Sequence, residues 1–448
     1  MVKNRAASAS HPQRGFSLIE IMIGLVIGLI AVLVIYQVYT VSEGFKRNTT
    51  AAGEAQMNGL FSTFVLGMEI ANGGAGTAVS SVDLGACADP TTYPATDPRH
   101  FAQSFRPIPV MIYDGAGASK PDSFVVNYSI ATTLAATAMF NVNTPPDQPY
   151  EIQSPGGFHA GDLIIGVVNP SGGDNASGCA SSQVISAVPA APNQRWVSFF
   201  GALKPVASVA ITHTAVTYTG PNADFTGICT PGQGTAQPDP VTGQPPACPS
   251  PTPNSTLFNM GPANRAQKVM YRLCDGRTSC PQPPVCGQSS PCTLESVALL
   301  GPNGQPLATN PAGNPLASNI VNMKVEYGIA DPLDPLGLLN TWVQADVGGG
   351  WDPATLLPAL TKQINLIKAI RIGLIVQSEQ FDKNLAGFTG GDYVNGDYNW
   401  VLFDCAQVNC PGRLTGSVAA SSSPPGNWRF RKYETVIPLR NEIWNKQS

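Results

Sequence analysis

Charged side chains are scarce in this 448-residue chain, because Asp, Glu, Lys and Arg make up only 12% of it. A soluble globular domain usually carries about 25%. The formal net charge is −4, so there is neither a basic field that would attract nucleic acid nor a long acidic tail. Histidine is also rare. The four histidines are isolated in sequence and predict no local metal site: His11, His100, His159 and His213.

The motifs of common enzyme classes are absent from the sequence. There is no G-x-S-x-G, no H-E-x-x-H and no P-loop. The glycine-rich segment 73–80 follows a predicted helix rather than a strand, which disfavours a dinucleotide site. We therefore predict no enzyme and no cofactor, and a membrane-anchored periplasmic enzyme is the weakest alternative.

Glycine and proline are abundant, with 45 and 41 residues, and predict many turns and short strands. The ten cysteines are an even number spread through this loop-rich sequence, which favours disulfides in an extracytoplasmic compartment. All ten are candidate disulfide cysteines: Cys87, Cys179, Cys229, Cys248, Cys274, Cys280, Cys286, Cys292, Cys405 and Cys410.

Four of these cysteines, at 274, 280, 286 and 292, are evenly spaced. A four-thiolate zinc site usually contains C-x₂-C pairs, which are absent here, so two local disulfides are favoured over zinc and we predict no metal. Four cysteines allow three pairings. Cys405 and Cys410 could close a small loop, and Cys229 and Cys248 flank the proline-rich segment 230–255, which we expect to be a surface loop.

The N-terminal segment has the pattern of a membrane anchor. Residues 1–15 are polar and basic, and residues 21–41 are almost entirely apolar and carry no charge. About 20 apolar residues match the hydrocarbon thickness of a bilayer. The positive-inside rule places the first residues in the cytoplasm and the rest of the chain outside.

Glu20 does not fit a plain anchor, because a carboxylate at membrane depth is costly unless it is neutralised or paired. A secretory signal peptide would be cut after its apolar core at a small-x-small site, and no such site follows Val41. A plain signal anchor leaves the string Gly15-Phe16-Ser17-Leu18-Ile19-Glu20 unexplained.

That string resembles the processing site of type IV prepilins and type II secretion pseudopilins. The resemblance implies that a prepilin peptidase cuts between Gly15 and Phe16 and that the new Phe16 amine is methylated. It also implies that Glu20 pairs with the N-terminal amine of a neighbouring subunit during assembly. A buried carboxylate and a buried ammonium are each costly alone and become tolerable together, which agrees with this role.

A single helix is predicted from about Phe16 to Ala71, roughly 80 Å long at 1.5 Å per residue, with Gly73-Gly74 ending it. Its second half should be amphipathic and pack on the globular region, as in pilins. Gln37 stands where many pilins have a proline, which disfavours a kink there. The apolar residues at helical spacing are Met57, Leu60, Phe61, Phe64, Val65 and Met68.

Beyond residue 75, short runs rich in Val, Ile, Thr and aromatics predict strands. They are 123–133, 162–169, 183–188, 196–200, 209–219, 268–274, 294–300, 320–329, 369–377 and 433–439. A short helix with Asp352 as N-cap is predicted over 352–368. The residues Asp392, Asn395, Asp397 and Asn399 offer oxygen ligands for calcium, but their spacing departs from a calcium loop and favours turns.

The segments 321–329, 369–379 and 431–441 resemble the strands of PilW-type minor pilins, and less closely those of J-type minor pseudopilins. The fold expected is α+β, with a long transmembrane and amphipathic helix packed on an antiparallel, loop-rich β head. The expected parts are a leader at 1–15, a membrane and assembly helix at 16–41, its amphipathic continuation at 42–75, a Pro/Gly/Cys-rich insert region at 76–318 and a PilW-like β region at 319–448.

The resemblance implies a minor pilin of a type IV pilus that helps to initiate assembly or form the tip. Its partners would be prepilin peptidase, other minor and major pilins, and the bacterial inner membrane, with the head in the periplasm and later on the fibre. Two alternatives stay open. One is a minor pseudopilin of type II secretion, and the other is a tip adhesin whose residues 85–315 bind a surface or host ligand.

Overall fold

A computed structural model gives the structure of the chain in two units, Met1–Gly53 and Glu54–Ser448. The described residues are 15, 17–75, 108–130, 137–140, 149–153, 157–168, 178–189, 196–199, 202–205, 209–213, 216–219, 226–229, 255–262, 268–276, 280, 284–287, 290–301, 307, 311–334, 337–346, 348–356, 363–382, 389–404, 412–422 and 425–440.

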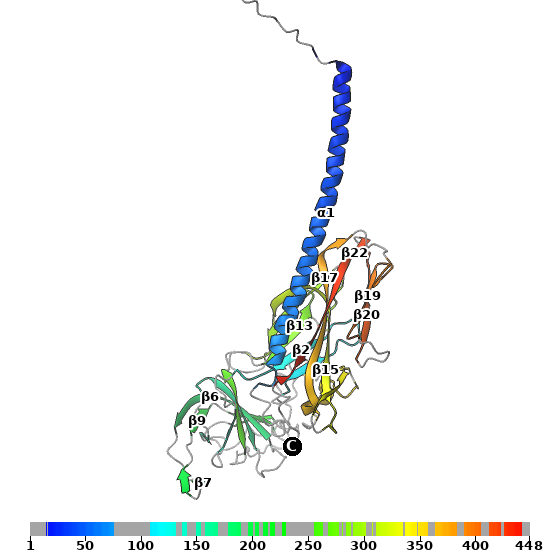
Figure 1. The fold of residues 1–448 in the computed structure, drawn as a ribbon. Coiled ribbons are helices and arrows are strands. Elements are labelled where there is room, and N and C mark those ends of the chain that lie inside the picture. The colour runs from blue at the N-terminus through cyan, green and yellow to red at the C-terminus, as the bar shows by residue number, and fades with distance from the viewer. Residues whose placement is uncertain are drawn as a thin grey trace, which may run out of the picture. The chain divides into compact units, whose positions relative to one another are not determined.

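The long predicted helix is confirmed as α1, Leu18–Ala71, a single helix of 54 residues. It ends where the glycine pair predicts, because the Gly73 amide donates to the Ile70 carbonyl and Gly74 takes a positive φ of 75°. The antiparallel β-rich head that follows confirms the predicted α+β fold (Figure 1).

The main sheet of the head, here called the frame sheet, has the strand order β1-β2-β13-β14-β15-β17-β22-β21, with β16 paired to β15. All of the described strand pairings in this sheet are antiparallel. The strands are β1 (Val110–Tyr113), β2 (Ser123–Asn127), β13 (Lys268–Cys274), β14 (Cys292–Ala298), β15 (Asn314–Ala330), β16 (Leu339–Val343), β17 (Ile367–Asp382), β21 (Ser421–Ser422) and β22 (Pro425–Pro438). Since β15 starts at Asn314 and pairs with β14, this sheet continues across residue 318.

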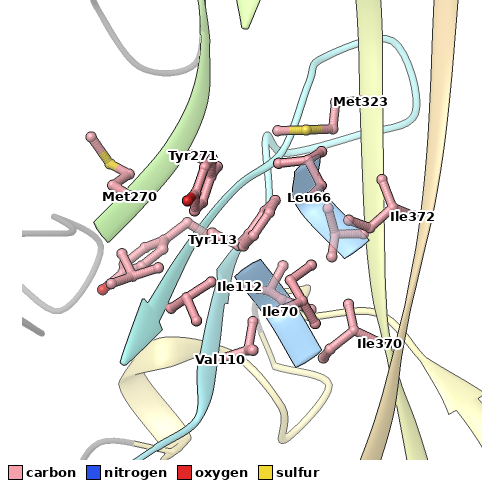
Figure 2. Packing of buried hydrophobic residues seen from close by; sticks show 14 of the residues in the cluster. Leu66, Ile70, Val110, Ile112, Tyr113, Met270, Tyr271, Met323, Ile370 and Ile372 are labelled. Atoms are coloured by element: carbon pink, nitrogen blue, oxygen red, sulfur yellow. The ribbon is translucent and has the colours of Figure 1, made fainter. Parts of the chain in front are cut away.

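The C-terminal half of α1 packs on the frame sheet through its smaller side chains. Figure 2 shows Leu66 and Ile70 of α1 in one cluster with Ile370 and Ile372 of β17, and all four are fully buried. The other α1 residues buried in the head unit are small: Ala55, Gly59 and Ser62. The prediction that the large apolar residues of this half face the head is therefore wrong. Five of them are 45–69% exposed: Met57, Leu60, Phe61, Phe64 and Met68. Small residues face the sheet because they let the helix backbone approach it closely.

At Gly59 the helix lies so close to the sheet that a Cβ there would overlap the ring of Tyr433 on β22. The Tyr433 hydroxyl in turn donates to the Ala55 carbonyl at 3.4 Å. We expect Gly59→Val to lower the free energy of unfolding by about 1–3 kcal/mol through overpacking. Thermal unfolding of the purified protein measures this. Gly53→Val is the matched control, since a Cβ at Gly53 meets nothing within 4 Å. Equal melting temperatures for the two variants would contradict this packing.

A three-stranded sheet, β18 (Tyr393–Val394), β19 (Asp397–Leu402) and β20 (Leu414–Val418), forms a second core with the frame sheet. Val321 of β15 and Ile375 of β17 lie in this core with Trp400 and Leu402. The frame sheet is thus covered on one face by α1 and on the other by this small sheet.

The residues considered for calcium form the hairpin between β18 and β19. Asn395 and Gly396 have positive φ values of 52° and 87°, as a two-residue Asn-Gly hairpin turn requires. The Asp397 carboxylate accepts the Ala420 amide at 2.7 Å, and the Asp392 carbonyl accepts the Asn399 amide at 2.7 Å. The turn interpretation thus accounts for this Asp/Asn/Gly cluster.

The β13–β14 hairpin carries two disulfides, Cys274–Cys280 and Cys286–Cys292. Cys274 is the last residue of β13 and Cys292 the first of β14, so each strand end is joined to the loop between them. Glu295 lies beside the first pair, but disulfide sulfurs do not offer the thiolates that zinc needs. The predictions for the other six cysteines fall outside the described part of the chain. Backbone alone is described for Cys179 in β6 and Cys229 in β11. Neither backbone nor side chain is described for Cys87, Cys248, Cys405, Cys410 and the segment 230–254.

A second sheet, here called the inserted sheet, lies in the chain between β2 and β13. Its strand order is β11-β10-β6-β5-β12-β3, with β9 paired to β6 and β4 paired to β9. The strands are β3 (Thr137–Met139), β4 (Tyr150–Ile152), β5 (Asp162–Val168), β6 (Gly178–Pro189), β9 (Val209–His213), β10 (Val216–Thr219), β11 (Thr226–Cys229) and β12 (Thr256–Pro262); β7 (Trp196–Phe199) and β8 (Ala202–Pro205) pair only with each other in the described part of the chain.

The helix predicted over 352–368 is wrong in its second half. Of its described residues, only Pro353–Leu356 form an α-helix, α4, started by Asp352, whose carboxylate accepts the Thr355 hydroxyl at 2.6 Å. Residues 364–366 form a 3-10 turn, and β17 begins at Ile367. The alternating apolar residues of β17 continue the sheet into positions that the sequence pattern assigned to the helix.

Candidate processing and assembly site

The residues expected at the cleavage site lie just before α1. Gly15 is exposed and is not helical, and a Cβ added at this glycine would meet no atom within 4 Å. Phe16 and residues 1–14 lie outside the described residues. Because α1 begins at Leu18, the Gly15 side of the predicted scissile bond is accessible to a peptidase.

Glu20 lies in the first turn of α1, and its carboxylate accepts the Ser17 amide at 3.4 Å. The Ser17 carbonyl accepts the amides of Glu20 and Ile21 at 3.0 and 3.1 Å. The contact is one half of a capping box, in which an acid at the third helical position satisfies an amide at the helix start. The sequence analysis missed this role, although the Ser-x-x-Glu spacing signals it. Glu20 therefore also stabilises the start of the helix that it is expected to align.

The side chains after Glu20 form an apolar surface with no cover in the described chain. Large apolar residues from Leu18 to Val41 are 50–76% exposed. In the described residues, α1 is the one helix long and apolar enough to cross a membrane. Such a surface is stable only in lipid or against other apolar helices, so single-pass anchoring follows from it.

The second half of α1 adds a further apolar surface. Phe64 and Met68 border a groove of about 390 Å³, which is also lined by Thr63, Gly67, Ala71, Asn72 and Arg440. The exposed Met57, Leu60 and Phe61 continue this surface toward the N-terminus of the helix. Exposed apolar patches of this kind mark interaction sites, and this one lies on the side of α1 opposite the residues buried in the head.

The head also holds ionisable groups with strongly shifted pKa values on β15 and its neighbours. The buried Asp122 carboxylate accepts the Lys324 ammonium at 2.6 Å and the Val325 amide at 2.9 Å, yet burial raises its pKa to about 6. Burial raises the pKa of Glu326 to about 7, although the Arg371 guanidinium donates to it at 2.6 Å. Each of the two carboxylates is thus paired with a buried cation inside the folded head.

The two carboxyls predict a pH dependence of stability. Their folded-state pKa values lie above the value of about 4 for an exposed carboxyl, so the stability they contribute is present below pH 4 and is lost as the pH rises through 6 and 7. We expect the free energy of unfolding to fall by about 2–5 kcal/mol between pH 5 and pH 8. Denaturant unfolding across this range measures it, and Glu326→Gln should flatten the curve. A stability that rises with pH would contradict the prediction.

Residues 10–36 match the family model described as the prokaryotic N-terminal methylation motif. No curated protein and no solved structure matches the chain significantly. The matched residues include Gly15, Phe16 and Glu20, so the chain carries the N-terminal motif of type IV pilin-like prepilins, which are processed by a prepilin peptidase and assemble with other pilins.

Proposed function

We propose that this chain is a minor pilin of a bacterial type IV pilus, and that it takes part in initiating the fibre or in forming its tip complex. The observation that carries the proposal is the methylation motif at residues 10–36, joined without interruption to a 54-residue helix with an exposed apolar surface. In this role the chain is a structural subunit and not an enzyme, and the head lies in the periplasm before assembly.

The size of the head favours a minor over a major subunit. A shaft subunit repeats along the fibre, and each copy must pack its head against its neighbours. The head here carries a complete second sheet beyond the frame sheet, which would crowd such a repeat. At the tip the same bulk meets no further subunit.

Intact-mass and N-terminal peptide analysis tests the proposal. The protein is purified from cells with and without prepilin peptidase. We expect a mature N-terminus of methylated Phe16 that disappears when the peptidase is absent. An uncleaved chain in peptidase-positive cells, or one cut after Val41, would refute the pilin proposal. Even distribution of the protein along purified fibres would refute the tip position.

The inserted sheet favours a second candidate function, a tip adhesin built on the same frame, over a purely structural role. Cells that express the chain without its inserted sheet should then make fibres but fail to attach to a surface or host.

A minor pseudopilin of type II secretion would show a different defect. Deletion of the whole gene would block release of secreted proteins and leave fibre extension and twitching unchanged.

A further inference from the structure

We infer that residues 128–267, here called the inserted domain, fold independently of the frame sheet and are not needed for processing or assembly. This inference deepens the proposed function, because it assigns assembly to the frame and leaves the inserted domain free for contacts outside the fibre. Its folding part does not depend on the proposed function.

The inserted domain leaves and rejoins the frame sheet at one point. Asn127, the last residue of β2, is the register partner of Lys268, the first residue of β13. Adjacent strands lie about 5 Å apart, so a two-residue turn could join these two residues directly. The frame sheet is therefore continuous in space without the 140 residues between them.

The inserted domain has its own sheet and its own core. In the described chain, none of its strands pairs with a frame strand. Its fully buried apolar residues include Phe140, Tyr150, Ile164 and Leu257, which belong to a cluster separate from the frame core. A segment with a sheet and a core of its own has what a domain needs to fold alone.

In the described residues, hydrogen bonds join the two parts at the C-terminal end of α1, through residues 128–130, here called the neck. The Gly74 amide donates to the Asn127 carbonyl at 2.8 Å, and the Ser129 amide donates to the Ala75 carbonyl at 2.7 Å. Within the domain, the Ile130 amide donates to the Met260 carbonyl at 3.3 Å. The neck thus leaves the frame at the C-terminal end of α1.

Calorimetry of the full-length protein in detergent tests independent folding with two matched variants. Ile164→Ala opens a cavity in the inserted domain and Ile372→Ala opens one in the frame, and both side chains are fully buried. We expect two transitions, with each substitution lowering only one of them by about 5–15 °C. One transition lowered by both variants would overturn the inference.

Excision tests whether assembly needs the domain. Residues 128–267 are replaced by Asn-Gly, which joins Asn127 to Lys268. We expect this chain to be cleaved and incorporated into fibres within about twofold of wild type, with a slightly lower melting temperature because Tyr128 no longer donates to Glu69. If the frame of the excised chain melts normally but the chain is not incorporated, assembly needs the inserted domain and the inference is wrong. If the frame no longer shows its own melting transition, the two parts do not fold independently.

A control separates these outcomes from failure of the proposed function. Adding Ile372→Asp to the excised chain should abolish incorporation, which shows that the assay detects an unfolded frame. If the wild-type chain itself is not cleaved at Gly15, the minor-pilin proposal fails while calorimetry still decides whether the domain folds independently.

Discussion

Glu20→Gln is expected to reduce incorporation of the subunit into fibres by at least about tenfold while leaving cleavage intact. A tenfold change corresponds to about 1.4 kcal/mol. A carboxylate–ammonium contact at membrane depth contributes more than this. Glutamine keeps the size of the side chain, and it also serves at the third position of a capping box. The hydrogen bond from the Ser17 amide can therefore persist, and the variant removes only the charge.

Quantitative mass spectrometry of sheared fibres, normalised to the membrane pool, measures this effect. Glu43→Gln is the matched control, since Glu43 is an exposed acid on the same helix that pairs locally with Arg47 at 3.3 Å. We expect the control to assemble normally. Wild-type incorporation of Glu20→Gln would show that Glu20 acts through the helix start alone.

The elements with long, regular patterns were predictable from sequence. The helix to Ala71 and the strands β13, β15, β17 and β22 follow directly from apolar periodicity and from the glycines and prolines that bound them. The short strands β1 and β16, of four and five residues, were not predicted.

Pairings between distant segments were beyond the reach of local pattern. The contact of β2 with β13 joins residues that are separated by the whole inserted domain, and nothing in either strand indicates its partner. The predicted face of α1 toward the head was wrong for a related reason. Apolarity marked Phe61 and Phe64, but the fit of Gly59 against Tyr433 decides the packing, and that fit is visible only in three dimensions.

The candidate processing site was the most predictable part, because a peptidase reads a short linear string. The motif match covers that same string, and only the capping contact of Glu20 required the structure. The buried charges of β15, in contrast, could not be predicted from a linear string. Lys324 and Glu326 look like ordinary solvent-facing positions of an alternating strand, but both are buried. Lys324 pairs with Asp114 and Asp122, and Glu326 pairs with Arg371 of β17.

Arg371→Leu is expected to destabilise the head by about 3–5 kcal/mol at pH 8, because it leaves Glu326 buried without its cation. The Arg371 guanidinium also lies over the rings of Trp342 and Phe403, at 4.7 and 4.3 Å from their centroids. Leucine preserves apolar contact with both rings, so most of the loss should come from the charge on Glu326.

The pH dependence separates charge from packing. Burial already raises the pKa of Glu326 to about 7, and removal of Arg371 raises it further, so the variant carries a neutral Glu326 at pH 5. The deficit should therefore shrink at pH 5, and the double variant Glu326→Gln/Arg371→Leu should recover most of it at pH 8. Arg413→Leu, which removes an exposed pair with Asp404, should cost less than about 1 kcal/mol at either pH. An Arg371→Leu deficit that is equal at both pH values would show that the aromatic stacking, and not the ion pair, holds this part of the head together.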